Sequence, residues 1–239
     1  MVDFCAFQGW RPTPEFADSV AAVPYDVVNT TEARAEVTGK PNSILRVTRP
    51  DVDLPDGASL YDDRAYATAQ AAFQRLLDEG VLQQDQSRHL YAYAQTMGNH
   101  RQVGLMGMAS AADYWADRIK KHEFTRPTKE DDRMRHIEAV RSHLGPIFLA
   151  YRAHEAIDVV VANVVSKPAP VDFVASDGIR HELWPIGDSD MVARIEAGFA
   201  ELPALYIADG HHRAAAASRI GRDASQNEPR GAFLAVAFP

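Results

Sequence analysis

Apolar residues recur at helical intervals in two long stretches of the chain. The clearer pattern covers residues 60–79, where Ser59 is expected to cap a helix and Gly80 to end it. A second helix is predicted over residues 128–144, with Thr128 as its N-cap. Both stretches predict amphipathic helices that bury one face. The apolar stripe of the first helix consists of Ala65, Ala69, Phe73 and Leu76.

Shorter apolar runs, bounded by Gly, Pro or Asn, predict strands. Residues 89–97 and 102–110 are two such runs on either side of Gly98, and together they predict a hairpin. Further strands are expected at residues 4–14, 20–28, 43–50, 147–153, 158–165, 172–176, 180–186, 204–209 and 232–238. Short helices are expected at residues 29–39, 188–199 and 211–220.

This mixture of elements predicts an α+β fold with mixed sheets and packed helices. We expect an N-terminal α/β region over residues 1–110 and a second region over residues 111–239, or one intertwined domain made of both. The apolar strand at residues 232–238 is followed almost at once by the end of the chain. Domains seldom end on a core strand, so we expect the sequence to be the N-terminal part of a longer protein.

The composition is that of a globular protein, with 46% hydrophobic and 24% charged residues among 239. The net charge of -8 counts against DNA or RNA as a partner, although residues 118–129 form a locally basic stretch. The sequence has no apolar run long enough for a membrane span and no signal peptide at its N-terminus. The single cysteine, Cys5, cannot form an internal disulfide, so we expect a cytoplasmic protein.

The most informative polar residues follow the strand that is predicted near the C-terminus. Asp209-Gly210 separates this strand from a helix that begins with His211, His212 and Arg213. The first N–H groups of a helix lack partners within it and carry the positive end of the helix dipole, so they favour a bound anion. Gly210 lets the backbone approach that anion, and Arg213 offers a charged fork suited to phosphate. The alternative is an ordinary helix start with Asp209 as its cap.

A second group of polar residues lies at residues 122–133. Glu123 stands between His122 and a basic stretch, and Lys129 and Arg133 lie near or on the helix that follows. A carboxylate within reach of a substrate hydroxyl can act as a general base, and phosphoryl transfer needs mainly positioning and charge neutralisation. The alternative is a surface turn followed by a helix start.

A third candidate combines residues 23–28 with residues 42–50, although chemistry alone favours a core strand and a proline turn there. The chain contains no Walker loop, Rossmann fingerprint, H-E-x-x-H zinc motif or nucleophile elbow. His211 and His212 are adjacent, so on a helix their side chains point apart and do not favour a shared zinc ion.

These segments resemble, in order, the motifs of the bacterial and archaeal family called domain of unknown function 1015. The resemblance runs from about residue 5 to residue 239. It is most specific in D-G-H-H-R at residues 209–213 and in the motif H-E-x-T-x-P-x-K-x-x-D-R. The residues that match the second motif are His122, Glu123, Thr125, Pro127, Lys129, Asp132 and Arg133.

The D-G-H-H-R turn also resembles the phosphate-binding turn of the ParB/sulfiredoxin superfamily, which includes free-serine kinases. This resemblance implies a ParB/sulfiredoxin-like core over residues 111–239, with Glu123 as catalytic base and Asp209 holding Mg²⁺ or orienting the loop. Sulfiredoxin chemistry is not expected, because its turn carries a cysteine where this chain has His211. The nucleotide phosphates would be held by Gly210, His211, His212 and Arg213. The expected substrate-binding residues are His122, Thr125, Lys129, Arg133, Tyr25, Asp26 and Arg46.

The function that this resemblance implies is a small-molecule kinase that phosphorylates free L-serine, with Mg²⁺ and ATP or ADP as cofactors. The expected partners are therefore a nucleotide and a small hydroxy amino acid. Two alternatives stay open at this stage. One is a nucleotide-binding regulator or NTPase that has no serine acceptor, and the other is a non-enzymatic interaction module.

Overall fold

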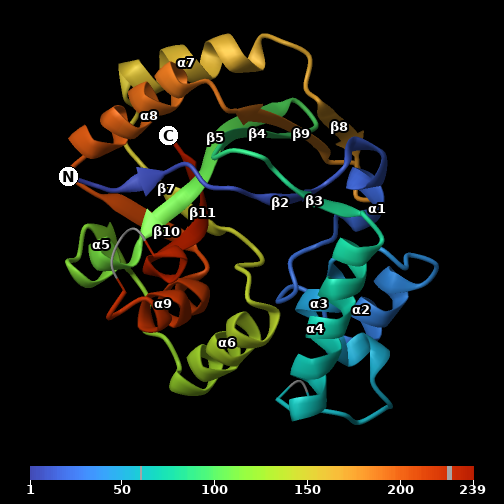
Figure 1. The fold of residues 1–239 in the computed structure, drawn as a ribbon. Coiled ribbons are helices and arrows are strands. Elements are labelled where there is room, and N and C mark those ends of the chain that lie inside the picture. Colours follow the sequence, from blue (N-terminus) through green and yellow to red (C-terminus); the bar gives the residue numbers. More distant parts are fainter. Residues whose placement is uncertain (60, 225–227) are drawn as a thin grey trace. The chain divides into compact units, whose positions relative to one another are not determined.

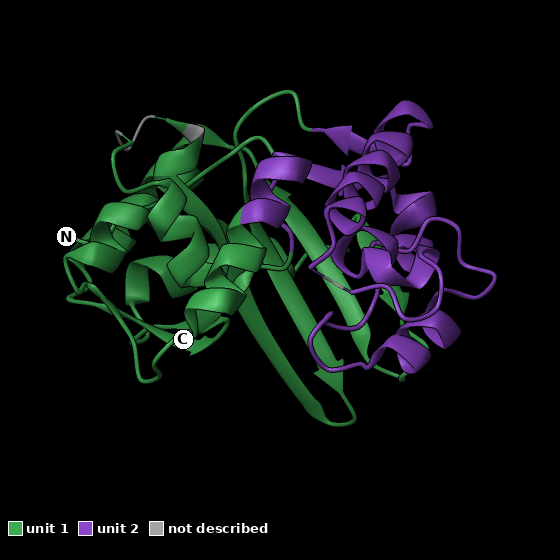
Figure 2. Cartoon of the chain, turned by 90° about the horizontal axis from the view of Figure 1, so that it is seen from below, with its two compact units in different colours: residues 1–9, 85–134, 145–239 green, residues 10–84, 135–144 purple. Residues whose placement is uncertain are grey.

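A computed structural model describes residues 1–59, 61–224 and 228–239. The chain divides into two compact units, coloured green and purple in Figure 2. The boundary expected at residue 110 falls within the first of them. Unit 1 comprises residues 1–9, 85–134 and 145–239, and unit 2 comprises residues 10–84 and 135–144.

Unit 1 contains a mixed sheet of nine strands within the described part of the chain. The strands are β1 Phe4–Cys5, β4 Leu90–Met97, β5 His100–Ser110, β6 Ile119–Lys120, β7 Ile147–Ala150, β8 Val171–Val174, β9 Arg180–Ile186, β10 Leu205–Asp209 and β11 Ala232–Phe238. Their order is β6-β10-β7-β11-β5-β4-β9-β8, and β1 pairs with β5. The β6–β10 and β7–β11 pairs are parallel and the others are antiparallel.

The helices of unit 1 lie on both faces of this sheet. They are α5 Ala111–Trp115, α6 Pro127–Val140, α7 Glu155–Val165, α8 Ser189–Glu201, α9 His211–Ile220 and the 3₁₀ turn η3 Pro229–Gly231, and α6 runs on into unit 2. Figure 1 shows α7 and α8 together on one side, with α5 and α9 on the other. In the core, Phe4 of β1 stacks on Phe199 of α8 with ring centroids 4.4 Å apart.

Unit 2 is mostly helical. Its elements are β2 Trp10–Pro12, η1 Pro14–Phe16, α1 Ala17–Val20, α2 Thr30–Val37, α3 Leu45–Thr48, η2 Pro50–Asp53, α4 Asp63–Asp78 and β3 Leu82–Gln84. The two strands pair with each other in an antiparallel ribbon. The predicted stripe of α4 is buried, and Gly80 ends this helix region with a φ of +70°.

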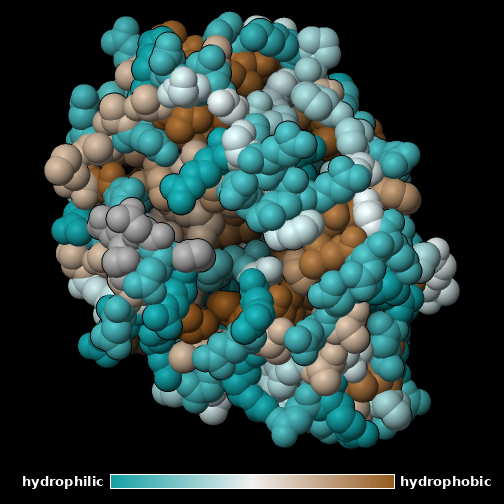
Figure 3. Space-filling view, in the orientation of Figure 1, coloured by the Kyte–Doolittle hydropathy of each residue, from teal (hydrophilic) through white to brown (hydrophobic). Residues whose placement is uncertain are grey.

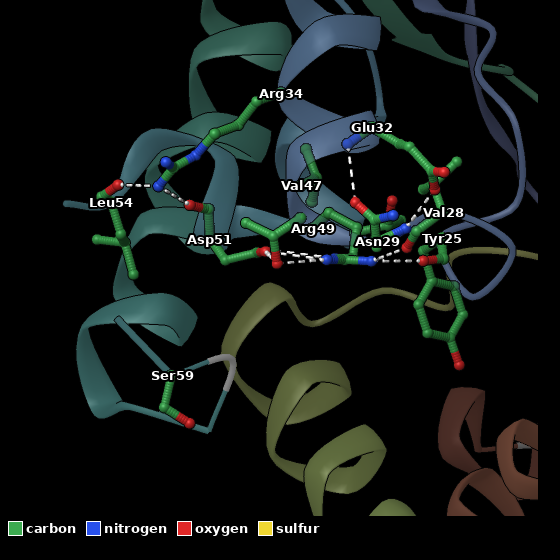
Figure 4. Close-up of polar contacts among 12 residues, drawn as sticks. Tyr25, Val28, Asn29, Glu32, Arg34, Val47, Arg49, Asp51, Leu54 and Ser59 are labelled. Carbon is green, nitrogen blue, oxygen red and sulfur yellow. Dashed lines mark hydrogen bonds and ion pairs between the residues drawn. The ribbon is translucent and has the colours of Figure 1, made fainter. Parts of the chain in front are cut away.

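A buried arginine organises the loop before α2 (Figure 4). Arg49 pairs with Asp51 at 3.0 Å and donates to the backbone carbonyls of Tyr25 and Val28. Burial alone would raise the pKa of Asp51, but hydrogen bonds from Arg49 and Thr30 outweigh it and hold that pKa below its usual value. These contacts fix the loop that leads into the helix.

The α+β prediction is confirmed, and so are the hairpin of β4 and β5 and the helices α2, α4, α6, α8 and α9. The strand predicted at residues 43–50 is wrong, because α3 and η2 occupy this segment. Leu45 packs with Ala33 and Val37, whereas Val47 packs in a different cluster. Residues at i and i+2 share one face of a strand, so a helical turn is needed to bury these two on different sides.

Two more strand predictions are wrong. Residues 158–165 belong to α7, in which Ile157, Val160 and Val164 are buried at helical spacing. The valines favour a strand by intrinsic preference, but packing of one helix face overrides it. Residues 20–28 form no strand, because Val20 ends α1 and a turn that begins at Pro24 follows.

The predicted caps of the two long helices are displaced along the chain. Asp62 caps α4 by accepting the Arg64 N–H at 2.9 Å, while Ser59 accepts the Tyr61 N–H instead. Leu60, the first residue of the predicted helix, lies outside the described residues. Helix α6 begins at Pro127, because proline suits the first helical position. Thr128, the predicted N-cap, therefore lies inside the helix. The same helix ends at Val140, short of the predicted residue 144.

The face drawn in Figure 3 is mostly hydrophilic, with apolar side chains in small groups. Among the described residues, no helix combines the length and the apolar character that crossing a bilayer requires.

Candidate functional site

Two parallel strands bring distant polar segments to one edge of the sheet in unit 1. Ile119 of β6 pairs with Leu205 of β10, and Lys120 pairs with Tyr206. Parallel neighbours end at the same edge, so the segments that follow them meet. We call residues 121–126 the His-Glu loop and residues 209–213 the DGHHR turn. This pairing explains how His122 and His211, which are 89 positions apart in the sequence, come into contact.

The DGHHR turn changes direction sharply between β10 and α9. The register of β10 against β7 shifts between Ile207 and Asp209, and Gly210 follows with a φ of +94°. A side chain is strained at this φ, and a Cβ on Gly210 would lie 3.2 Å from Nε of Arg213. Gly210 itself is the N-cap residue, and no side chain caps the helix. Asp209 is therefore not the helix cap of the ordinary alternative.

Arg213 braces the turn from inside. Its Nη2 donates to the Asp209 carboxylate at 2.6 Å, and its Nη1 donates to the carbonyls of Gly145 and Pro146 at 3.3 and 3.2 Å. Its side chain is only 13% exposed, whereas that of Asp209 is 67% exposed. The two carbonyls precede β7, the strand next to β10, so Arg213 links the turn to the segment that leads into this neighbouring strand.

His211 lies at the centre of the site. Its Nε2 accepts the backbone N–H of His122 at 3.4 Å, and its Nδ1 lies 3.5 Å from Oε2 of Glu123. The rings of His122 and His211 meet edge to face, with centroids 4.4 Å apart. Burial, together with the neighbouring His122, lowers the pKa of His211. Because Nε2 accepts this hydrogen bond, a neutral His211 carries its proton on Nδ1, the nitrogen nearer to Glu123.

His212 contacts a different part of the His-Glu loop. Its Nε2 accepts the backbone N–H of Arg126 at 3.1 Å. Burial lowers the pKa of His212, and the positive charge of Lys129 lowers it further. The adjacent histidines therefore hold the two ends of the same loop from the first turn of α9.

The start of α6 is tied to the far end of α9. Thr125 donates to Glu130, and Arg219 donates to Glu130 at 2.9 Å and to Asp131 at 2.8 Å. These contacts anchor the loop end that carries the exposed Phe124. Thr125 thus has a structural contact in addition to its predicted contact with substrate.

Metal-ligating atoms gather at one point of the site. One atom each from His122, Glu123 and His211 lies within 4.8 Å of the other two. His211 is 4% exposed and Glu123 is 59% exposed, so the cluster opens from a buried imidazole toward solvent. Asp209, the predicted Mg²⁺ ligand, is paired with Arg213 and stands outside this cluster.

The sequence model of the family described as "Protein of unknown function (DUF1015)" matches residues 4–239. The chain belongs to this family. No curated protein and no solved structure matches it.

Several residues that the DUF1015 resemblance suggested have other contacts. Arg133 pairs with Asp132 at 2.5 Å, and both side chains are largely buried. Tyr25, Asp26 and Arg46 belong to unit 2, whereas the site described above is built from unit 1 alone. Arg46 donates to the carbonyl of Val37 at 2.9 Å and to Asp53, which holds the end of α2.

The sequence does not predict four residues that contribute to the candidate site: Phe124, Glu130, Asp131 and Arg219. Phe124 is fully exposed and is the one large apolar side chain in a polar loop, which is a readable signal. The other three act through contacts between α6 and α9, and nothing in a local pattern reports such contacts.

Proposed function

We propose that this chain is a nucleotide-dependent small-molecule kinase whose acceptor is a free hydroxy amino acid, most simply L-serine. The observation that carries the proposal is the position of Glu123. Its carboxylate lies 3.5 Å from a histidine in the first turn of α9, a helix without a side-chain cap. An anion-binding helix end beside an exposed carboxylate is the arrangement that phosphoryl transfer to a hydroxyl needs.

The phosphate subsite of this proposal is the N-terminus of α9. No side chain caps this end, and the first backbone N–H groups of a helix lack partners within it and carry the positive end of its dipole. Arg126 and Lys129 add positive charge near this end, as the effect of both on His212 indicates. We assign Arg213 to holding the turn in shape, in keeping with its hydrogen bonds to Asp209 and to the carbonyls of Gly145 and Pro146. The resemblance adds a phosphate contact to this role.

In this proposal Glu123 is the base. The acceptor hydroxyl gives its proton to Glu123 while its oxygen forms a bond to the terminal phosphorus, and the P–O bond to the nucleotide leaving group breaks. His211 lies 3.5 Å from this carboxylate without neutralising it, because a neutral imidazole carries no charge. Mg²⁺ would neutralise phosphate charge when bound, and the exposed Asp209 carboxylate offers the oxygen ligand that this ion prefers.

We further propose that residues 111–239 include a ParB/sulfiredoxin-like core and that the DGHHR turn is its phosphate turn. The resemblance supports both statements, and the strand–glycine–helix geometry is compatible with them. A cytoplasmic location belongs to the same proposal, because nucleotide and free serine are found together there.

The test is phosphoserine formation by the full chain with Mg²⁺, ATP or ADP, and L-serine, measured by mass spectrometry. Glu123→Gln should lower the rate by about 10²–10⁴-fold while nucleotide affinity is kept. The matched control is Glu201→Gln. Glu201 is also an exposed carboxylate beside a histidine, 3.0 Å from His154, but it lies at the end of α8.

Three results decide between the functions. An unchanged rate in Glu123→Gln would exclude Glu123 as the base. Nucleotide binding by a wild-type chain that makes no phosphoserine would instead support a nucleotide-binding regulator or NTPase. Binding should then survive Glu123→Gln and be lost in Arg213→Ala. A thermal-shift screen without any nucleotide or phosphate response would favour an interaction module, since a ligand at 100 times its Kd stabilises by about 2.7 kcal/mol.

A further inference from the structure

We propose that His122, Glu123 and His211 form a binding site for one divalent transition-metal ion of the class that prefers imidazole, such as Zn²⁺. Two imidazoles and one carboxylate from three side chains are a donor set that zinc enzymes use, with a fourth position left for water or substrate. The ligand atoms already lie within 4.8 Å of one another.

The distances need little change to suit a metal. Ligand atoms of a tetrahedral zinc ion lie roughly 3.4 Å apart, because zinc–ligand bonds are about 2.0–2.2 Å long. Oε2 of Glu123 and Nδ1 of His211 lie 3.5 Å apart, close to that spacing. The His122 side chain is exposed and follows a two-residue strand, so rotation can bring its imidazole closer.

The site combines one fixed ligand with two adjustable ones. His211 is 4% exposed and sits in the first turn of α9, which packs against the sheet through buried alanines. Glu123 is 59% exposed and can change rotamer without disturbing the core. A metal on Nδ1 of His211 would displace the hydrogen bond from the His122 N–H to Nε2. The reason is that a neutral imidazole bound through Nδ1 carries its proton on Nε2, which then no longer accepts. At 3.4 Å that bond is long and weak.

The donor types select the metal. Mg²⁺ and Ca²⁺ prefer oxygen ligands, whereas imidazole suits zinc, copper, nickel and iron. Among the described residues, this is the group of three such side chains whose ligand atoms converge. The site is therefore distinct from a Mg²⁺–phosphate site at Asp209.

A metal at this site would compete with the base. A divalent cation bound to the Glu123 carboxylate makes that carboxylate a much weaker base, so we expect Zn²⁺ to inhibit phosphoryl transfer. This inhibition rests on the proposed function, but metal binding itself does not.

Metal binding is measured on the full chain after removal of metals by a chelator, without nucleotide or serine. Co²⁺ serves as the probe because its visible absorption bands become intense in tetrahedral coordination. We expect binding of one Co²⁺ per chain and displacement by Zn²⁺. His122→Ala and Glu123→Gln should each weaken Co²⁺ affinity at least tenfold, and Glu123→Asp should restore part of it. His154→Ala is the matched control, since it removes a histidine that faces a single carboxylate, Glu201.

Absence of stoichiometric Co²⁺ binding by the wild-type chain would overturn the inference, and so would equal affinity in His122→Ala. Both altered side chains are exposed, and circular dichroism verifies that each variant is folded. If the chain binds Co²⁺ but makes no phosphoserine, the proposed metal site is supported and the proposed kinase activity is contradicted. If the chain makes phosphoserine but binds no Co²⁺, only the proposed metal site is contradicted.

Discussion

His211 and His181 are both histidines of unit 1 whose pKa is lowered by burial, yet their surroundings differ. Nδ1 of His181 is hydrogen bonded to the hydroxyl of Tyr93 at 2.7 Å, and its ring stacks on Phe173 with centroids 5.2 Å apart. His211 instead faces the carboxylate of Glu123 at 3.5 Å, at an edge that opens to solvent.

The charges around the two histidines follow the same contrast. Near His181, Arg180 pairs with Asp172 at 2.5 Å and Arg101 pairs with Glu182 at 3.1 Å, so opposite charges match. Near His211, the exposed Glu123 faces a neutral imidazole. Burial and a lowered pKa are thus common to a structural histidine and a candidate site. Unmatched polar groups that converge at an exposed edge distinguish the two.

The largest effect on stability should come from Arg213→Ala. This change removes three hydrogen bonds from a largely buried guanidinium, and bonds to charged groups contribute about 1.5–3 kcal/mol each before compensation. Such contributions do not add when the bonds share one group, so we expect the free energy of unfolding in urea to fall by at least about 2–3 kcal/mol. Arg213→Lys should recover less than half of this loss, because an ammonium group cannot reach the carboxylate and both carbonyls at once.

Arg180→Ala is the matched change beside His181. Both partners of its ion pair are more than a third exposed, so we expect a loss below about 1 kcal/mol. Equal losses in the two variants would break the comparison, since they would mean that Arg213 is no more important to its turn than a surface arginine is to its strand.

A smaller effect is expected for Tyr93→Phe. The change deletes the hydroxyl that bonds His181 and leaves the ring in place, so we expect a loss of about 1 kcal/mol in unfolding free energy. Co²⁺ affinity should stay at the wild-type value, because the His122, Glu123 and His211 cluster has no contact with Tyr93 in any described interaction. If Tyr93→Phe weakens Co²⁺ binding as much as His122→Ala does, the two regions are coupled and the contrast fails.

The parts of the fold that could be predicted are those with local signals. The hairpin of β4 and β5, the N-cap of α8 at Asp188 and the junction at Gly210 all follow from short-range pattern and turn chemistry. The sequence of α3 predicts a strand instead, because the alternation of Leu45 and Val47 fits a strand as well as a helix. Only their packing in two different clusters distinguishes the two.

The candidate site shows the same limit. His122, Glu123 and the DGHHR turn are readable as chemistry, but their contact depends on the pairing of β6 with β10. Strand β6 has only two residues and gives no periodic signal. The same long-range register directs Arg213 toward carbonyls and Asp209, and no local pattern predicts those partners.

The smallest effect is the pH dependence that His181 contributes. Burial lowers the pKa of its folded form below the usual value of 6.5, and the negative charge of Asp177 only partly opposes this. Between the folded and unfolded pKa values the unfolded chain binds more protons, so the free energy of unfolding rises with pH there. The contribution is complete above pH 6.5 and is lost as pH falls through the folded pKa.

Urea unfolding at pH 7.5 and 5.5 measures this contribution, which cannot exceed about 1.4 kcal/mol per pH unit for one group. We expect the free energy of unfolding to differ less between pH 7.5 and pH 5.5 in His181→Gln than in the wild-type chain. The control is His100→Gln, which also removes one histidine but takes it from an exposed position at the start of β5. Equal reductions in both variants would mean that the pH dependence reflects the number of histidines and not the burial of His181. An unchanged difference in His181→Gln would mean that its ring takes up a proton as readily in the folded chain as in the unfolded one.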